Sequence, residues 1–304
     1  WAQRIPSLPV LMTVLWIVFV MNAYNFMDGT DGLAAAFAVA VGLGLFLAYL
    51  PEAAQIQALR THICFILAFA MVLIGVSLGF LFYNWPPAST FLGDCGSQYV
   101  GFLLAAFLAQ VTLVEQQPAL DPTGSTLDVV LDRRGHVDFL ACLILLWPFL
   151  YDVLYTLVRR TMRLKAVWRA HHEHLYQRLH DTGWSHRAIL CFSFPFYLAH
   201  AILFYLYVWA ATPGGRQLWA AIALAPMILY TIVVIACETT ARSLRARIEA
   251  ATETPAETPA PRRGGTALSA EELDALEAPV AESETPAPRG PYQEIERDTT
   301  ALRP

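Results

Sequence analysis

The chain has 304 residues, of which 56% are hydrophobic and only 15% are charged, and its mean hydropathy is +0.46. These values are typical of a polytopic membrane protein and exclude an ordinary secreted or cytosolic enzyme. The formal net charge of -5 gives no indication of a nucleic-acid partner, since the acidic residues are concentrated in the C-terminal tail.

Apolar segments of about 20 residues recur along the chain, and each is long enough to cross a bilayer as a helix. We predict an all-α polytopic membrane protein with seven spans, over residues 8–24, 32–50, 62–82, 97–114, 137–157, 187–210 and 217–237. The first residue is Trp1 rather than Met, and the first span follows without a charged leader. We therefore expect the natural N-terminus, with earlier spans, to be missing.

The first polar stretch, at 22–34, lies between two apolar segments. Its polar and glycine residues include Asn22, Asn25, Asp28, Gly29 and Asp31. A carboxylate near hydrocarbon must be held by a cation, by hydrogen bonds or by water, so a cation or polar ligand is expected here. The Asp-Gly steps favour a turn in which a ligand can approach the backbone closely, with a helix restarting at about Leu33. The alternative is a capped loop without a ligand.

The second polar loop, at 91–102, places Asp94 between two glycines and Ser97 where the next span is expected to begin. Mg²⁺ prefers oxygen ligands and often binds through one or two carboxylates together with substrate phosphates. Asp94 is therefore the candidate metal ligand. The alternative is that Asp94 and Ser97 only cap the following helix.

Asp152 lies within the apolar fifth span, where an unpaired charge is costly. The sequence leaves two interpretations open. Asp152 either pairs with Arg159 or Arg160, seven or eight positions later, or contacts a substrate.

The third polar loop, at 168–180, has three histidines within four positions, followed by an arginine. These are His171, His172, His174 and Arg178. Such residues can bind metal or phosphate or transfer protons, but their spacing is not that of a zinc site. Anion binding is the preferred interpretation, and contact with anionic membrane lipids is the alternative.

Lysines and arginines near span ends predict orientation. They gather between the fifth and sixth spans and after the last span, so both regions are expected to be cytoplasmic. Counting back through the spans places all three polar loops on that face, as a single active site requires. Residues 1–250 are the predicted membrane domain. The Pro- and Glu-rich segment 251–304 is a predicted disordered cytoplasmic tail.

The three motifs resemble those of the polyprenyl-phosphate N-acetylhexosamine-1-phosphate transferases, in glycosyltransferase family 4. They read Asn22-xx-Asn25-xx-Asp28-Gly-x-Asp31-Gly-Leu-Ala, Gly93-Asp94-x-Gly-Ser97-xxx-Gly-Phe and His174-Leu-Tyr-Gln-Arg178-Leu. The resemblance covers about residues 5–190. The family includes phospho-N-acetylmuramoyl-pentapeptide translocase and enzymes that start O-antigen, enterobacterial common antigen and teichoic acid synthesis.

The resemblance implies a multi-pass enzyme of the bacterial inner membrane. It would transfer an N-acetylhexosamine 1-phosphate from a UDP-sugar to undecaprenyl phosphate and release UMP, with Mg²⁺ or alternatively Mn²⁺ bound at Asp94. The expected catalytic residues are Asp28, Asp31 and His174. The expected substrate contacts are Asn22, Asn25, Gly29, Asp152, His172 and Arg178. Membrane lipids are further expected partners, and a homodimer is left open.

Two departures from the family pattern affect this interpretation. The family's earlier Asp-Asp pair has no counterpart, and its expected place lies before Trp1. Truncation is the preferred explanation; the alternative is an inactive relative that binds lipid phosphate or scaffolds polysaccharide assembly. The third motif has Tyr176 and Gln177 where many members have histidines, which favours the branch that starts surface polysaccharides. A transporter is disfavoured, because the charged groups gather at one face.

Overall fold

A computed structural model describes residues 7–53, 60–115, 137–166 and 171–253. The chain divides into two units, Trp1–Ala250 and Ala251–Pro304, and the first contains the helix bundle. The tail predicted at the C-terminus lies, beyond residue 253, outside the described residues.

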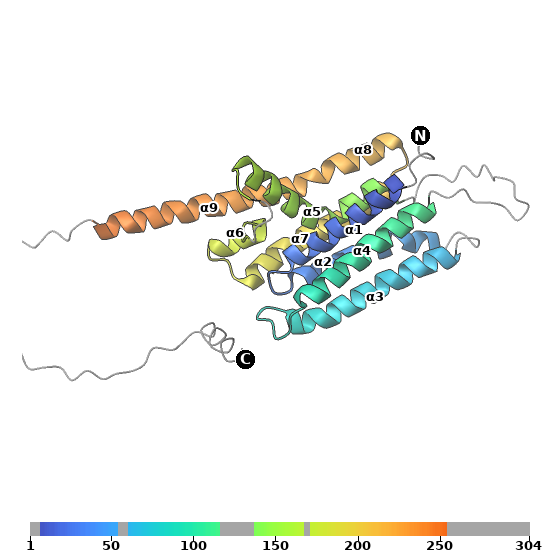
Figure 1. Cartoon of the computed structure of the whole chain (residues 1–304), viewed down its shortest axis with the longest axis horizontal. Coiled ribbons are helices and arrows are strands. Elements are labelled where there is room, and N and C mark those ends of the chain that lie inside the picture. Colours follow the sequence, from blue (N-terminus) through green and yellow to red (C-terminus); the bar gives the residue numbers. More distant parts are fainter. Residues whose placement is uncertain (1–6, 54–59, 116–136, 167–170, 254–304) are drawn as a thin grey trace, which may run out of the picture. The chain divides into compact units, whose positions relative to one another are not determined.

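Nine helices and no strand occur in the described ranges (Figure 1). The helices are α1 (Ser7–Met27), α2 (Leu33–Ala53), α3 (Arg60–Asn84), α4 (Gly93–Glu115), α5 (Phe139–Met162), α6 (Leu175–Asp181), α7 (His186–Val208), α8 (Pro213–Ile222) and α9 (Leu224–Glu253). Seven segments are long and apolar enough to cross a membrane, and six of them closely match the predicted spans. The prediction of an all-α polytopic membrane protein is therefore confirmed for the described part of the chain.

The seventh span differs from its prediction, because α8 and α9 share it with a break at Ala223. Pro226 explains the break: it has no N–H to bond to the carbonyl of Ile222, and its ring would collide with that carbonyl in a continuous helix. The neighbouring carbonyl oxygen of Ala223 lies 3.1 Å from Nε2 of His200, a buried residue of α7.

The fourth span also begins earlier than predicted. α4 starts at Gly93, whose φ of 67° lies in the left-handed region that favours glycine. Ser97 is consequently one turn inside the helix, where its hydroxyl oxygen lies 3.0 Å from the carbonyl oxygen of Gly93. The expectation that Ser97 caps this helix is wrong.

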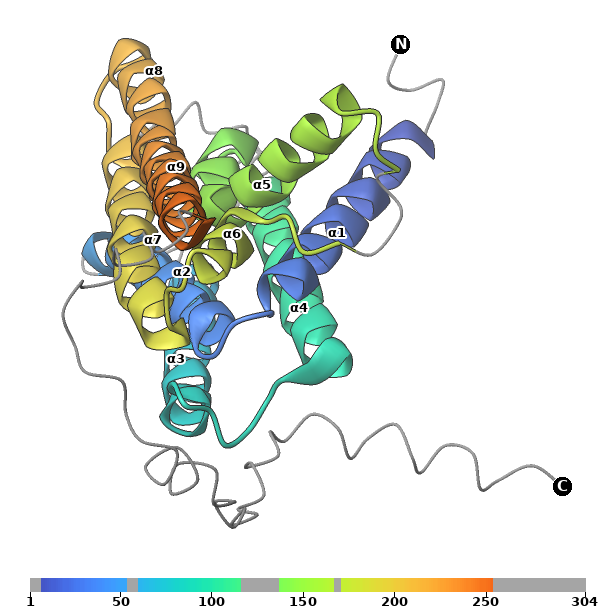
Figure 2. The ribbon, with the colours of Figure 1, turned by 90° about the vertical axis from the view of Figure 1, so that its left-hand side faces the viewer.

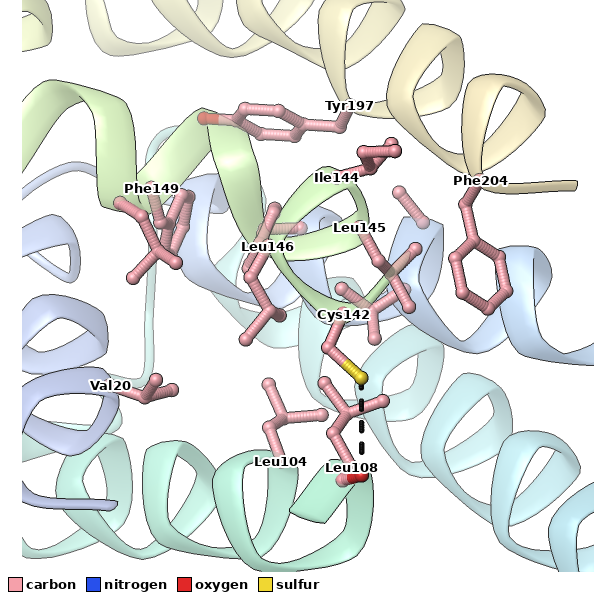
Figure 3. Packing of buried hydrophobic residues seen from close by; sticks show 14 of the residues in the cluster. Val20, Leu104, Leu108, Cys142, Ile144, Leu145, Leu146, Phe149, Tyr197 and Phe204 are labelled. Carbon is pink, nitrogen blue, oxygen red and sulfur yellow. Dashed lines mark hydrogen bonds between the residues drawn. The ribbon is translucent and has the colours of Figure 1, made fainter. Parts of the chain in front are cut away.

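The core is formed where α5 packs between α4, α7, α1 and α2. Figure 3 shows Leu104 and Leu108 of α4 facing Leu146 and Cys142 of α5. The Cys142 Sγ lies 3.9 Å from the Leu108 carbonyl oxygen. Close packing of this kind, rather than exclusion of water, holds helices together in lipid.

α2 is the most buried span, and it packs against α3 on one side and α7 on another. α3 is largely exposed, with apolar side chains such as Val72, Val76 and Phe82 on its outer surface. This is what a lipid-facing helix presents.

Three polar segments lie at the same end of the helix bundle: the α1–α2 loop, the α3–α4 loop and α6 (Figure 1). Figure 2 views the bundle from this end and shows α6 beside α7. The prediction that the motif loops share one face is confirmed. The assignment of this face to the cytoplasm stays a prediction.

Candidate functional site

The α1–α2 loop is shaped by bonds that its own residues provide. The N–H of Asp28 donates to the carbonyl of Asn25 at 3.2 Å, and Leu33 begins α2, as predicted. Gly32 has a φ of 76°, and its N–H donates to Oδ1 of buried Asn84 at 2.8 Å. The loop is therefore fixed to the end of α3 through a side chain that the sequence analysis did not identify.

Asp31 joins this loop to two other elements. Its Oδ2 accepts a hydrogen bond from the N–H of Ala88 at 3.1 Å, in the α3–α4 loop. Its Oδ1 lies 3.2 Å from Nδ1 of His186, the first residue of α7. Both carboxylate oxygens have protein partners, so the structure favours the capped-loop interpretation for Asp31. Its catalytic role stays a prediction.

Asn25 joins α1 to α4. Its Oδ1 accepts a hydrogen bond from the hydroxyl of Ser97 at 2.5 Å. Asn22 lies one turn earlier and donates from Nδ2 to the carbonyl of Val18 at 2.7 Å, a bond within α1. The structure thus explains Asn25 as a link between two motif helices, whereas the substrate contacts expected for both asparagines stay predictions.

Asp28 and Asp94 lie next to this link. Asp28 follows Asn25 by three residues and is half-buried, while Asp94 precedes Ser97 by three residues and is exposed. Burial and the charge of Asp94 raise the pKa of Asp28 to about 7. The two carboxylates therefore repel each other at a place where the helix ends are held together.

A divalent cation would relieve this repulsion. Among the residues that the structure describes, no group of three or more His, Cys, Asp or Glu side chains is placed to hold a metal ion. Mg²⁺ needs fewer protein ligands, because it often binds through one or two carboxylates and completes its shell with water and substrate phosphates. Asp28 and Asp94 together fit such an ion. Metal binding by Asp94 and the catalytic role of Asp28 both stay predictions.

Asp152 of α5 fixes the beginning of α6. Its side chain is only 2% exposed, and its oxygens accept the N–H of Leu175 at 2.9 and 3.1 Å. Oδ1 also lies 3.2 Å from Nδ1 of His174, the N-cap residue of α6. The carboxylate satisfies a free N–H at a helix start, where negative charge is favourable. Asp152 therefore orients His174.

The alternative pairing of Asp152 with Arg159 or Arg160 is wrong. Seven residues are about two helical turns, or about 10 Å along the axis, and both arginines instead bind Glu173. Nη1 of Arg160 lies 2.7 Å and Nη1 of Arg159 lies 3.6 Å from its carboxylate oxygens. The hydrogen bond from Lys165 and these nearby arginines lower the pKa of Glu173.

Tyr176 connects α6 to the first motif loop. Its hydroxyl donates to the carbonyl of Phe26 at 2.9 Å, near the end of α1. The phenol also lies directly over Gly29, where a Cβ would collide with the Tyr176 hydroxyl. Gly29 is therefore required for close approach of a protein side chain, and its predicted contact with substrate stays untested. Tyr176, which departs from the family pattern in the sequence, thus joins α6 to the end of α1.

A polar cleft of about 180 Å³ lies between the α1–α2 loop and α6. Its lining includes Gly29, Thr30, His172, Tyr176, His180 and His186. His172 is exposed, with its Nδ1 3.3 Å from Nε2 of Gln177, and the rings of His180 and His186 are 5.1 Å apart. The cleft thus contains two predicted substrate contacts, Gly29 and His172, and two histidines, His180 and His186, that were not predicted as site residues.

Arg178 is buried and binds Glu238 of α9. Its Nε and Nη2 lie 2.5 and 2.8 Å from the two carboxylate oxygens, and its guanidinium lies 6.0 Å from the ring centre of Tyr155. A phosphate contact for Arg178 stays a prediction. The sequence analysis missed Glu238, although an ionisable residue at the end of an apolar span is a signal that could have identified it.

Comparison with known proteins gives both a family and individual relatives. Residues 2–112 match the family described as "Glycosyl transferase family 4". The chain is similar to the "Probable undecaprenyl-phosphate N-acetylglucosaminyl 1-phosphate transferase" of Bacillus subtilis, with 30% identity over 202 residues, which are 65% of this chain and 49% of the relative. It is 33% identical over 187 residues to the "Decaprenyl-phosphate N-acetylglucosaminephosphotransferase" of Mycobacterium tuberculosis, covering 60% of this chain and 43% of that one.

A third relative represents a different branch. The chain is 37% identical over 105 residues to the "Phospho-N-acetylmuramoyl-pentapeptide-transferase" of Parabacteroides distasonis, which covers 32% of this chain and 25% of that protein. The chain spans about half the length, or less, of the curated relatives it matches.

Proposed function

We propose that this protein is a polyprenyl-phosphate sugar-phosphate transferase, because residues 2–112, which contain the first two motifs, match glycosyl transferase family 4. The proposed donor is a UDP-N-acetylhexosamine, and the proposed acceptor is undecaprenyl phosphate. The names of two relatives favour N-acetylglucosamine as the sugar. The product would start a cell-envelope polysaccharide, with O-antigen-like synthesis as the expected branch.

The observation that carries the proposal is the meeting of three motif segments at one end of the bundle. The Asn25–Ser97 bond of 2.5 Å places Asp28 beside Asp94, and the Tyr176–Phe26 bond of 2.9 Å brings α6 to the same loop. Phosphoryl transfer depends mainly on positioning and on neutralising charge. Two carboxylates for a cation and a histidine segment beside them are the groups such a reaction requires.

The proposed reaction is an in-line displacement at phosphorus. An oxygen of the polyprenyl phosphate would attack the sugar-proximal phosphorus of the donor, forming a new diphosphate and releasing UMP as its bridging bond breaks. Bound Mg²⁺, or Mn²⁺, would neutralise negative charge on the donor diphosphate. Asp28 and Asp94 would hold that cation. His174, oriented by Asp152, and His172 in the cleft would contact the sugar-phosphate part of the donor.

An apolar groove suits the lipid part of the acceptor. It has a volume of about 570 Å³, and α1, α4 and α5 line it with side chains such as Trp16, Phe19, Leu108 and Phe139. The same three helices carry Asp94, Asn25 and Asp152 at the site. We propose that the prenyl chain lies along this groove, with its phosphate toward the carboxylates. The homodimer stays a prediction.

The reaction is tested by measuring UMP release from the full-length protein in detergent. The assay contains undecaprenyl phosphate and a panel of UDP-N-acetylhexosamines, each with and without Mg²⁺. We expect release that depends on Mg²⁺ and on one sugar, with N-acetylglucosamine tested first. No release with any sugar from folded protein would contradict the proposal. Retained binding of undecaprenyl phosphate in that case would favour the inactive-relative alternative.

A further inference from the structure

α9 reaches the candidate site through one carboxylate. Glu238 accepts hydrogen bonds from Nε and Nη2 of Arg178 at 2.5 and 2.8 Å, so one guanidinium uses both carboxylate oxygens. The two side chains are 16% and 6% exposed. A bidentate arginine–carboxylate pair fixes orientation as well as distance. Because the pair is mostly buried, removing one partner would leave the other charge uncompensated.

A second contact joins α9 to the end of α6. Nη2 of Arg245 donates to the carbonyl of Asp181, the last residue of α6, at 3.2 Å. Nη2 of Arg242 lies 3.4 Å from Glu238, but Arg242 is itself largely exposed. α9 therefore holds α6 in its middle and at its end.

α6 has seven residues, too few for an isolated helix to be stable, so its position depends on its partners. Asp152 of α5 holds its beginning, and Tyr176 joins its first turn to α1. The Arg178–Glu238 pair is the corresponding support from α9. Loss of any one support would let the short helix, and the histidines before it, shift.

We propose that Glu238 is a positioning residue for the transfer reaction. It acts through Arg178: the pair holds α6, and with it His174 and His172, against the end of the bundle that carries Asp28. This inference rests on the proposed function and extends it to α9, outside the matched residues 2–112. The pair would restrict the motion of α6 through the Arg178 side chain.

The kinetic test compares Glu238→Ala and Glu238→Gln with the wild type in the full-length protein. A displacement of about 1 Å at a site can cost about 100-fold in rate, so we expect kcat to fall by about that factor in Glu238→Ala. Glu238→Gln, which keeps the shape and one acceptor oxygen, should lose less. The KM for undecaprenyl phosphate should not change, because α6 lies outside the apolar groove.

Thr239→Ala is the matched control. Thr239 is the next residue of α9, is exposed, and its hydroxyl donates to the carbonyl of Ala236 within the same helix. We expect its kcat and both KM values to equal those of the wild type. If Glu238→Ala does not give monodisperse protein in detergent, Glu238→Gln is compared with Thr239→Ala instead.

Hydrogen exchange provides a readout independent of the reaction. The backbone amides of 175–183 should exchange about tenfold faster in Glu238→Ala than in the wild type, and Thr239→Ala should leave them unchanged. If the wild type releases no UMP, the proposed function fails, but this measurement still tests the support from α9. Unchanged exchange would overturn the inference even with reduced activity. Faster exchange with unchanged kcat would equally overturn the positioning role.

Discussion

At the scale of single residues, the candidate site is built around Asp28 and Asp94. Both come from motifs recognisable in the sequence. Their proximity depends on the Asn25–Ser97 hydrogen bond, which joins side chains 72 positions apart. From the sequence, Asp94 alone was predicted to bind the cation. Burial and the charge of Asp94 both raise the pKa of Asp28, so the two carboxylates interact, and Asp28 is included in the proposed cation site on that basis.

Asp28→Asn and Asp94→Asn should each lower Mg²⁺-dependent UMP release by at least about 100-fold, since each removes charge from the proposed cation site. Both variants should also require more Mg²⁺ for their residual activity. Cys95→Ser, an exposed neighbour of Asp94, serves as the control and should behave as the wild type. A normal Mg²⁺ requirement in Asp28→Asn would remove Asp28 from the cation site.

The stability of the protein without bound cations should depend on pH through Asp28. Its pKa rises on folding from 3.8 to about 7, so ionisation is more costly in the folded state. Stability should therefore fall as the pH increases from about 4 to about 7 and then level off. Thermal unfolding in detergent with a chelator, at about pH 5 and about pH 8, measures this change.

Asp28→Asn should lose this component of the pH dependence. Mg²⁺ added to the wild type at the higher pH should restore the unfolding midpoint, because a cation compensates the ionised pair. The same pH dependence in the variant and the wild type would assign the effect to another group.

At the scale of elements, α6 joins α1, α5 and α9. The fit between α6 and the first loop depends on Gly29, since a Cβ there would collide with the hydroxyl of Tyr176. The contact between the Tyr176 ring and Gly29 joins α6 to the α1–α2 loop, and no local pattern in either motif predicts it.

Gly29→Ala should therefore lower both thermal stability and UMP release by displacing α6. Tyr176→Phe should cost about 1 kcal/mol of unfolding free energy, because it removes one hydrogen bond to the carbonyl of Phe26. The double variant should be more stable than Gly29→Ala alone, since the colliding hydroxyl is absent. Thermal unfolding of the three proteins tests this non-additivity, and simply additive losses would argue against the collision.

At the scale of the whole molecule, the sequence was sufficient to predict the membrane spans and to predict that the three polar loops lie at one end of the bundle. Spans are predictable because each needs one long apolar segment, and the loops then alternate between two faces. The break at Ala223 and the early start at Gly93 depend on single residues within such segments. The bond between Tyr176 and Phe26 joins positions 150 apart, and the Arg178–Glu238 pair joins positions 60 apart. Contacts of this kind appear only after the helices have packed.

The pairing of Arg178 with Glu238 has a consequence for how the protein is made. Chains are synthesised from the N-terminus, so the motif residues all leave the ribosome before α9 does. A nascent chain that ended before Glu238 would contain all three motifs, the first six spans and most of the seventh, but α6 would lack its contact with the Glu238 carboxylate. We therefore expect α6 to take its final position only after residue 238 of α9 has been synthesised.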